Sequence, residues 1–147
     1  MTMTHTPDPQ TQAQFYRDVP LKRLLAWVVD TLVTLLACVV ILPFTAFTGL
    51  FFFPALYVTV NFIYRVVTLA NRSATWGMRL FAVEIRQANG ERLDATTALM
   101  HTIGYAVSWA VAPLQLISVV MMACTERKQG LSDHALGTVA INRRAAD

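Results

Sequence analysis

The chain has 147 residues, of which 55% are hydrophobic and only 14% are charged, and its formal net charge is +3. Soluble domains usually contain about 25% charged residues, so this composition excludes an ordinary soluble globular protein. The slight excess of basic residues forms no compact patch with interleaved aromatic residues, which argues against a nucleic acid as partner.

The first 20 residues are polar and contain prolines, so residues 1–20 are predicted to form a disordered cytoplasmic tail. Residues 24–64 then contain a single charged side chain, Asp30. This run is about twice as long as the roughly 20 residues that cross a bilayer. Pro43 and the small polar residues after it divide the run into two predicted spans, residues 21–42 and 50–70.

The connection between these two spans carries no charge, whereas basic residues precede the first span and follow the second. Basic residues next to spans usually stay in the cytoplasm, so the N-terminus is predicted to be cytoplasmic. The chain is therefore expected to be an integral membrane protein with several crossings of the bilayer.

A polar stretch with a strand-like pattern follows the second span. Val83 and Ile85 alternate with polar or small residues, and Asn89–Gly90 is a dipeptide that favours a tight turn. The pattern predicts a short cytoplasmic hairpin over residues 80–93. A second alternating segment, residues 138–142, is expected to be able to pair with it.

Residues 95–125 form a second run without charges, and a third hydrophobic segment is predicted at residues 96–124. Pro113 lies near its middle and removes a backbone hydrogen bond there, so the helix is expected to break. Two arrangements stay open: one tilted or kinked crossing, or a broken pair that enters the membrane and returns. The return is favoured because a single crossing would export Arg127 and Lys128. The predicted fold is therefore a mainly α integral membrane bundle of three hydrophobic segments with a short β element.

Asp30 is the first candidate functional residue, because carboxylates at membrane depth are rare and usually face the protein interior or a water-filled cavity. Arg23 lies two helical turns earlier on the same face, but about 10 Å away along the axis, which favours a shared polar seam over direct contact. Asp30 either binds a cation or exchanges a proton, or it locks helices together by accepting hydrogen bonds. The sequence leaves both interpretations open.

Each hydrophobic segment carries a polar stripe at helical spacing, which indicates three helices that share a polar centre. Asn61 and Arg65 in the second span and His101 in the third segment are secondary candidates for a site. A permeation path and a tightly packed bundle both explain such stripes. An imidazole at His101 is able to shuttle protons near neutral pH, but a single histidine near the end of a span is more often an interfacial or helix-pairing residue.

The tail after the third segment has Gly130 and Gly137 around a predicted short helix, capped by Ser132 or Asp133. Asp133 is also able to pair with an arginine near the membrane surface. Catalytic motifs of soluble enzymes and clusters with metal-ligand spacing are absent from the sequence, so neither an enzyme, a cofactor nor a metal site is expected.

Arg23, Asp30, and Asp133 in the segment QGLSDHALGTV (residues 129–139) together resemble the signature of the RDD family of membrane proteins, which is named after one Arg and two Asp. Residues 73–80 are also similar to the linker of that family. Where the family commonly has Thr-Pro-Gly-Lys, this chain has Thr-Trp-Gly-Met. The resemblance covers roughly residues 16–144, and the corresponding membrane domain is predicted at residues 21–144.

The resemblance implies a bacterial or archaeal membrane protein, and transport has been proposed for the family, with sodium/proton exchange attributed to some members. Carried to this chain, it suggests transport of ions or small solutes, or an accessory subunit of such transport. Asp30 would respond to a proton or cation, Arg23 would set its electrostatics and Asp133 would organise the cytoplasmic entrance. The alternative is a non-catalytic structural or assembly module. The expected partners are the lipid bilayer and a second copy or another membrane subunit.

Overall fold

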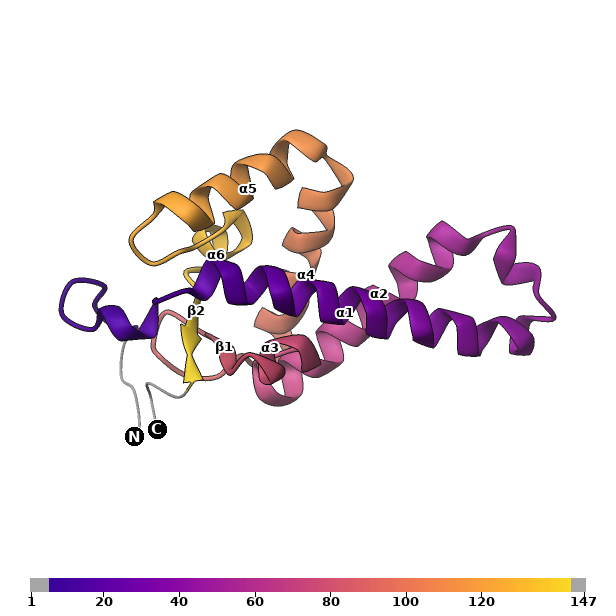
Figure 1. The fold of residues 1–147 in the computed structure, drawn as a ribbon, viewed down its shortest axis with the longest axis horizontal. Coiled ribbons are helices and arrows are strands. Elements are labelled where there is room, and N and C mark those ends of the chain that lie inside the picture. The colour runs from indigo at the N-terminus through magenta and orange to yellow at the C-terminus, as the bar shows by residue number, and fades with distance from the viewer. Residues whose placement is uncertain (1–5, 144–147) are drawn as a thin grey trace.

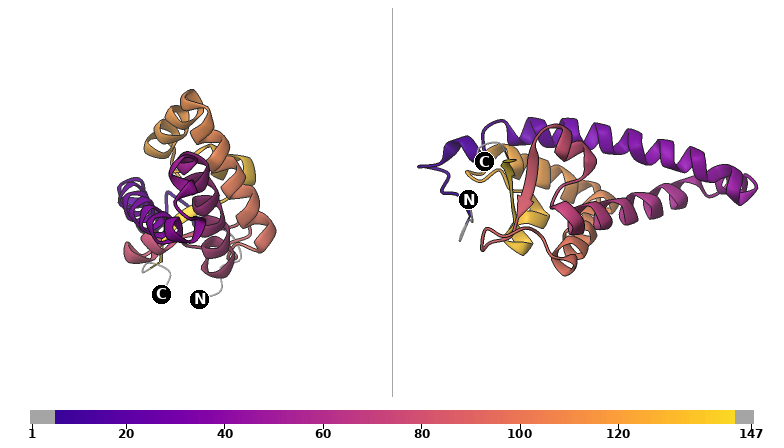
Figure 2. Two further views of the ribbon diagram at one scale, coloured as in Figure 1. Left: turned by 90° about the vertical axis from the view of Figure 1, so that its right-hand side faces the viewer. Right: turned by 90° about the horizontal axis from the view of Figure 1, so that it is seen from below.

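The structure is a computed structural model, and it describes residues 6–143. Two long helices, α1 (Val19–Ile41) and α2 (Phe53–Arg72), form a helical hairpin. The connection between them contains two short 3₁₀ turns, Leu42–Thr45 and Thr48–Leu50, and is called the tip below. Figure 2 shows that the tip half of the hairpin projects beyond all other elements. Both helices are long and apolar enough to cross a membrane.

Proline and charge explain the bounds of these two helices. Pro20 and Pro54 lie in the first turns of α1 and α2, where a missing N–H costs nothing. Pro43 follows the end of α1 and cannot continue its hydrogen-bond ladder. The outward faces are apolar and exposed, and Phe44 at the tip is 87% exposed. Such a surface is stable in hydrocarbon but costly in water.

The third hydrophobic segment consists of two helices, α4 (Ala95–Ala110) and α5 (Ala112–Cys124). The chain bends by 118° from α4 to α5 at Val111, and Pro113 lies in the first turn of α5. The expected break near Pro113 is confirmed. The elements before α4 and after α5 come together in one small sheet (Figure 1), which favours the returning pair over the single crossing.

That sheet has two antiparallel strands, β1 (Val83–Arg86) and β2 (Val139–Asn142). Their register pairs Val83 with Asn142 and Arg86 with Val139. The prediction of a hairpin over residues 80–93 was only partly right. The turn at Gly90 is present, but a single bridge between Arg86 and Arg92 closes it. The strand β1 pairs instead with β2, whose four residues are all buried.

The disordered tail predicted for residues 1–20 needs correction, while residues 1–5 lie outside the described part. A 3₁₀ turn at Ala13–Phe15 precedes α1, and Phe15 and Tyr16 are buried against Val139 and Ile141 of β2. The Tyr16 hydroxyl also donates a hydrogen bond to the Pro7 carbonyl, at 2.6 Å. Burial of the two aromatic side chains offsets part of the chain entropy that is lost when the segment becomes ordered.

Two further short helices complete the end of the molecule that carries the sheet. Helix α3 (Trp76–Leu80) follows α2, and α6 (Leu131–Leu136) follows α5. A buried apolar cluster joins α1, α2, α3, β1 and α4, and its members include Val19, Leu69, Ile85 and Ala98. The expected fold class, a mainly helical membrane bundle with a small β element, is confirmed.

Candidate functional site: two buried aspartates and a cavity

The carboxylate of Asp133 lies at the centre of a cluster that joins α1, α4 and α6. Oδ2 accepts hydrogen bonds from Arg23 Nη1 at 2.6 Å and from the Gly130 N–H at 3.1 Å. Oδ1 accepts one from Thr138 Oγ1 at 2.9 Å and lies 2.8 Å from His101 Nε2. The predicted short helix is present as α6 (Leu131–Leu136), but its N-cap is Gly130 and not Ser132 or Asp133. Asp133 lies in the first turn of α6, and its carboxylate accepts the hydrogen bond from the Gly130 N–H.

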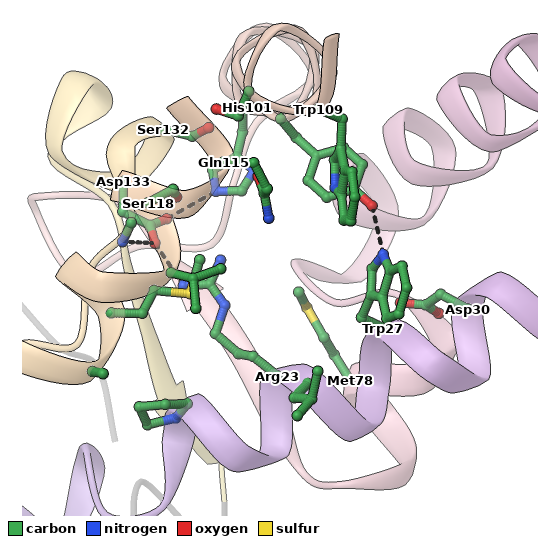
Figure 3. Close-up of a pocket in the computed structure, with 18 of the residues that line it drawn as sticks. Arg23, Trp27, Asp30, Met78, His101, Trp109, Gln115, Ser118, Ser132 and Asp133 are labelled. Carbon is green, nitrogen blue, oxygen red and sulfur yellow. Dashed lines mark hydrogen bonds and ion pairs between the residues drawn. The ribbon is translucent and has the colours of Figure 1, made fainter. Parts of the chain in front are cut away.

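Asp133 is 1% exposed, and the side chain of Arg23 is 11% exposed. Burial by itself raises the pKa of the Asp133 carboxyl, but the charge of Arg23 and the contact with His101 outweigh it and hold the pKa well below its usual range. The Arg23–Asp133 ion pair therefore persists at neutral pH. It ties together segments that are distant in the sequence (Figure 3).

Asp30 is also buried, at 2% exposure, but no cation lies within ion-pair distance of it in the described part of the chain. Its Oδ1 accepts hydrogen bonds from the Tyr64 hydroxyl at 2.7 Å and from the Gly77 N–H at 2.9 Å. Its Oδ2 accepts one from the Thr75 hydroxyl at 2.6 Å. Asp30 is the acceptor in all three contacts.

The segment Thr75–Gly77 explains how α3 docks on α1. Thr75 caps α3 by accepting a hydrogen bond from the Met78 N–H at 3.2 Å, while its hydroxyl hydrogen goes to Asp30. A Cβ atom at Gly77 would lie 2.2 Å from the carbonyl oxygen of Ala26, so only glycine allows this approach. The sequence comparison related this segment to the family linker but did not predict its contact with Asp30. A threonine able to cap a helix, two residues before a glycine, was the sequence feature that could have indicated this contact.

The other polar candidates form the seam between the helices. Asn61 Nδ2 donates to Thr34 Oγ1 at 3.2 Å, which joins α2 to α1. The Arg65 guanidinium lies over the ring of Tyr105 in α4, with Cζ 3.8 Å from the ring centroid. Trp27 Nε1 donates to the Tyr105 hydroxyl at 3.0 Å. The three polar stripes therefore meet, although Arg23 and Asp30 do not contact each other.

A cavity of about 440 Å³ lies beside this seam, between α1, α4, α5 and α6. Figure 3 shows Arg23 and Trp27 of α1 on one side of it, and His101, Trp109 and Gln115 on the other. The side chains of Asp30, Arg65 and Asp133 also reach its wall. Within residues 6–143, no group of three or more His, Cys, Asp or Glu side chains is placed to hold a metal ion.

Two long apolar helices, a broken third segment and charged groups buried between them define a multi-pass membrane protein. A sequence profile described as the RDD family matches residues 19–137, and the chain belongs to this family. The matched range includes Arg23, Asp30 and Asp133, and the resemblance noted in the sequence is confirmed. No curated protein and no solved structure matches the chain.

Proposed function

We propose that this RDD family protein takes a small solute into or across the membrane, as a transporter or as the membrane subunit of one. The observation that carries the proposal is the cavity of about 440 Å³ between α1, α4, α5 and α6. Binding sites for small molecules are usually cavities of about 300–1,000 Å³ with mostly apolar walls and a few polar groups. The cavity here has such walls.

The break between α4 and α5 supports this assignment. A helix break at membrane depth is tolerated where the freed backbone is buried in protein or faces a cavity. Transporters often build solute sites at such discontinuous helices. Here Ser108 and Trp109 precede the break at Val111, Gln115 follows it, and all three side chains line the cavity.

The surroundings of Asp30 support a positioning role for this carboxylate. Both of its oxygens already accept hydrogen bonds, from Tyr64, Thr75 and Gly77. A bound cation would have to replace these donors. Exchange of a proton or cation at Asp30 stays a prediction. In proteoliposomes, an exchanger with Asp30→Asn should lose pH-linked ion flux while it still folds and assembles.

The charge distribution supports an orientation with the sheet in the cytoplasm. Basic residues such as Arg17, Lys22 and Lys128 lie at the sheet end of the molecule, and Lys22 Nζ donates to Asn142 of β2 at 2.8 Å. The tip carries no charge, and uncharged connections cross membranes readily. We therefore propose a cytoplasmic N-terminus in a bacterial inner membrane.

The proposal includes a second copy or another membrane subunit. Around the tip half of α1 and α2, large apolar side chains such as Leu36, Val39 and Val40 are more than half exposed. Lipid covers such a surface well, and so does another helix. Two spans and one broken segment also surround the cavity only in part, which a partner would complete.

The second candidate is a structural or assembly module, and the hydrogen bonds of the two aspartates favour it. Asp133 and Asp30 each join three elements, and neither has an oxygen without a partner. In such a module, Asp30→Asn would impair assembly rather than transport. The cavity would then be a packing defect without a solute.

Uptake by purified protein in liposomes distinguishes the two candidates. Proteoliposomes are incubated with a defined mixture of organic acids, amino acids, amines and sugars, and their contents are analysed by mass spectrometry. Gln115→Trp fills the cavity, while Leu116→Trp adds the same bulk at a neighbouring side chain that is 68% exposed. The proposal expects one solute class to accumulate with Leu116→Trp but not with Gln115→Trp. Accumulation no greater than in empty liposomes would contradict it.

A further inference from the structure

Arg65 is a buried cation without a matching anion in the described part of the chain. Its residue is 4% exposed, and its Nε is buried and has no hydrogen-bond partner. No carboxylate lies within ion-pair distance of its guanidinium among residues 6–143. A guanidinium has five N–H donors. The contact of Arg65 with the ring of Tyr105 is a cation–π contact, which leaves those donors without conventional hydrogen-bond acceptors. Burying such a group without partners is costly.

The acidic side chains at the same cavity are already engaged. Asp133 pairs with Arg23, and Asp30 accepts three hydrogen bonds from Tyr64, Thr75 and Gly77. Asp30 also lines the cavity, yet no ion pair joins it to Arg65. The positive charge of Arg65 is therefore the one at the cavity wall that lacks a direct partner.

The rest of the cavity wall combines apolar surface with a few polar groups. The indole rings of Trp27 and Trp109 are stacked, with centroids 5.5 Å apart and planes at 13°. His101 is 1% exposed; its Nε2 faces Asp133, and its buried Nδ1 has no hydrogen-bond partner among residues 6–143. Aromatic rings of this kind bind apolar bodies well.

We propose that the cavity binds an organic anion with an apolar body. Its carboxylate, sulfonate or phosphate group pairs with the guanidinium of Arg65, and its body lies against Trp27 and Trp109. Arginine suits this role because its planar N–H groups bind two oxygens of one anionic group at once. This inference rests on the proposed function, since it assigns the charge and shape of the solute in the same cavity.

Two sources supply this chemistry. A soluble organic acid fits the volume of about 440 Å³ as a whole. An anionic phospholipid is larger, so its headgroup would occupy the cavity while its acyl chains remain in the bilayer. In both cases the anionic group is bound by Arg65.

Calorimetric titration of the purified protein in phosphatidylcholine nanodiscs tests the inference, with empty nanodiscs as the blank. The probes are 2-naphthoate and 2-naphthamide, which have the same body but differ in charge. Hydrogen bonds to a charged group contribute about 1.5–3 kcal/mol, or at least about tenfold in affinity. We therefore expect naphthoate to bind at least about tenfold more tightly than naphthamide.

Variants of Arg65 locate this preference. Arg65→Gln should abolish the preference for the anion, and Arg65→Lys should retain part of it because the charge remains while the paired N–H geometry is lost. Arg72→Gln is the matched control, because it removes an exposed arginine of the same helix two turns later. Thermal unfolding verifies that each variant is folded. If Arg65→Gln does not fold, Arg65→Lys and the pair of probes still decide the question.

Nanodiscs with phosphatidylglycerol in place of phosphatidylcholine distinguish the two sources. A lipid headgroup at Arg65 fills the cavity and should compete with both probes, so the apparent affinity of uncharged naphthamide should also fall in the wild type. A site for soluble acids should leave naphthamide unaffected, because the anionic surface repels only naphthoate. Equal binding of the two probes, or an unchanged preference in folded Arg65→Gln, would overturn the inference but not the proposed function. Failure of both probes to bind would also overturn it, while solute uptake that Gln115→Trp blocks would still uphold the proposed function.

Discussion

Asp133 and Asp30 are carboxylates of similar burial, 1% and 2% exposed, but their partners differ in charge. Asp133 is paired with the guanidinium of Arg23 and contacts an imidazole. Asp30 is surrounded by two hydroxyl groups and one backbone N–H, all neutral. Breaking a buried ion pair leaves a charge behind, whereas removing a carboxylate from neutral donors leaves only dipoles. Loss of Asp133 should therefore cost more stability than loss of Asp30.

The largest effect is expected for Asp133→Asn. The substitution leaves the buried Arg23 without its counter-ion, and the free energy of unfolding should fall by about 3–5 kcal/mol. Reversible unfolding in mixed detergent micelles measures this change. Asp18→Asn, at an exposed aspartate in the turn before α1, is the control and should change stability by less than about 0.5 kcal/mol. A loss below about 1 kcal/mol for Asp133→Asn would contradict the charge-pair description.

Gly77→Ala tests the neutral cluster through the backbone that forms it. The new Cβ would meet the Ala26 carbonyl oxygen at 2.2 Å, so α3 must move away from α1 and Asp30 loses the Gly77 N–H. Overpacking of this kind costs about 1–3 kcal/mol. At Gly49, by contrast, the closest atom to a new Cβ is the flexible end of Leu42, at 3.0 Å. Gly49→Ala should be close to neutral in the same unfolding assay, and equal effects of the two would argue against this docking.

A smaller effect is expected for Asp30→Asn. The amide retains one oxygen, which is still able to accept hydrogen bonds from Tyr64 and Gly77, and only the contact with Thr75 must rearrange. We expect a loss of about 1–2 kcal/mol, close to the value of one or two hydrogen bonds. Unfolding of this variant beside Asp133→Asn gives the comparison directly. The description fails if Asp30→Asn is the more damaging of the two.

The smallest effect is expected from pH in the neutral range. The pKa of Asp133 is held below its usual range in the folded protein, chiefly because Arg23 outweighs the opposing effect of burial. Its contribution to stability is therefore complete above the unfolded pKa of about 4 and is lost only as pH falls through the lower folded pKa. His101 contacts Asp133 at 2.8 Å, and histidine is the side chain that commonly changes charge near neutral pH, so the comparison is made in a His101→Gln background. There, the difference in unfolding free energy between the proteins with and without Asp133→Asn should stay constant from pH 5 to 8. A decline within that window would show that the carboxyl titrates there.

Much of the fold could be predicted from the sequence because hydrocarbon imposes simple rules. The absence of charge in residues 24–64, apart from Asp30, and in residues 95–125 located the hydrophobic segments, and Pro113 located the break. The alternation in residues 138–142 located β2. In each case a local pattern determined the element.

The partners of the charged groups could not be predicted in the same way. Arg23 and Asp133 are 110 residues apart in the sequence, and helical spacing connected Arg23 only with Asp30. Phe15 and Tyr16 were assigned to a disordered tail because most residues around them in the sequence are polar. These two side chains are buried only through their contact with β2, which is distant in the sequence. The position of α3 depends on the close approach of Gly77 to the Ala26 carbonyl of α1. This contact joins two distant segments, so no local sequence pattern predicts it.

A double-mutant cycle tests most directly whether Arg23 serves Asp133 rather than Asp30. Arg23→Met is combined with Asp133→Asn and, separately, with Asp30→Asn, and unfolding free energies are measured in the same micelles. Paired residues show coupling energies of about 0.5–3 kcal/mol, while independent sites are additive to within about 0.5 kcal/mol. We predict a coupling energy near the upper value for Arg23 with Asp133 and additivity for Arg23 with Asp30. Strong coupling of Arg23 to Asp30, with additivity toward Asp133, would contradict the arrangement described.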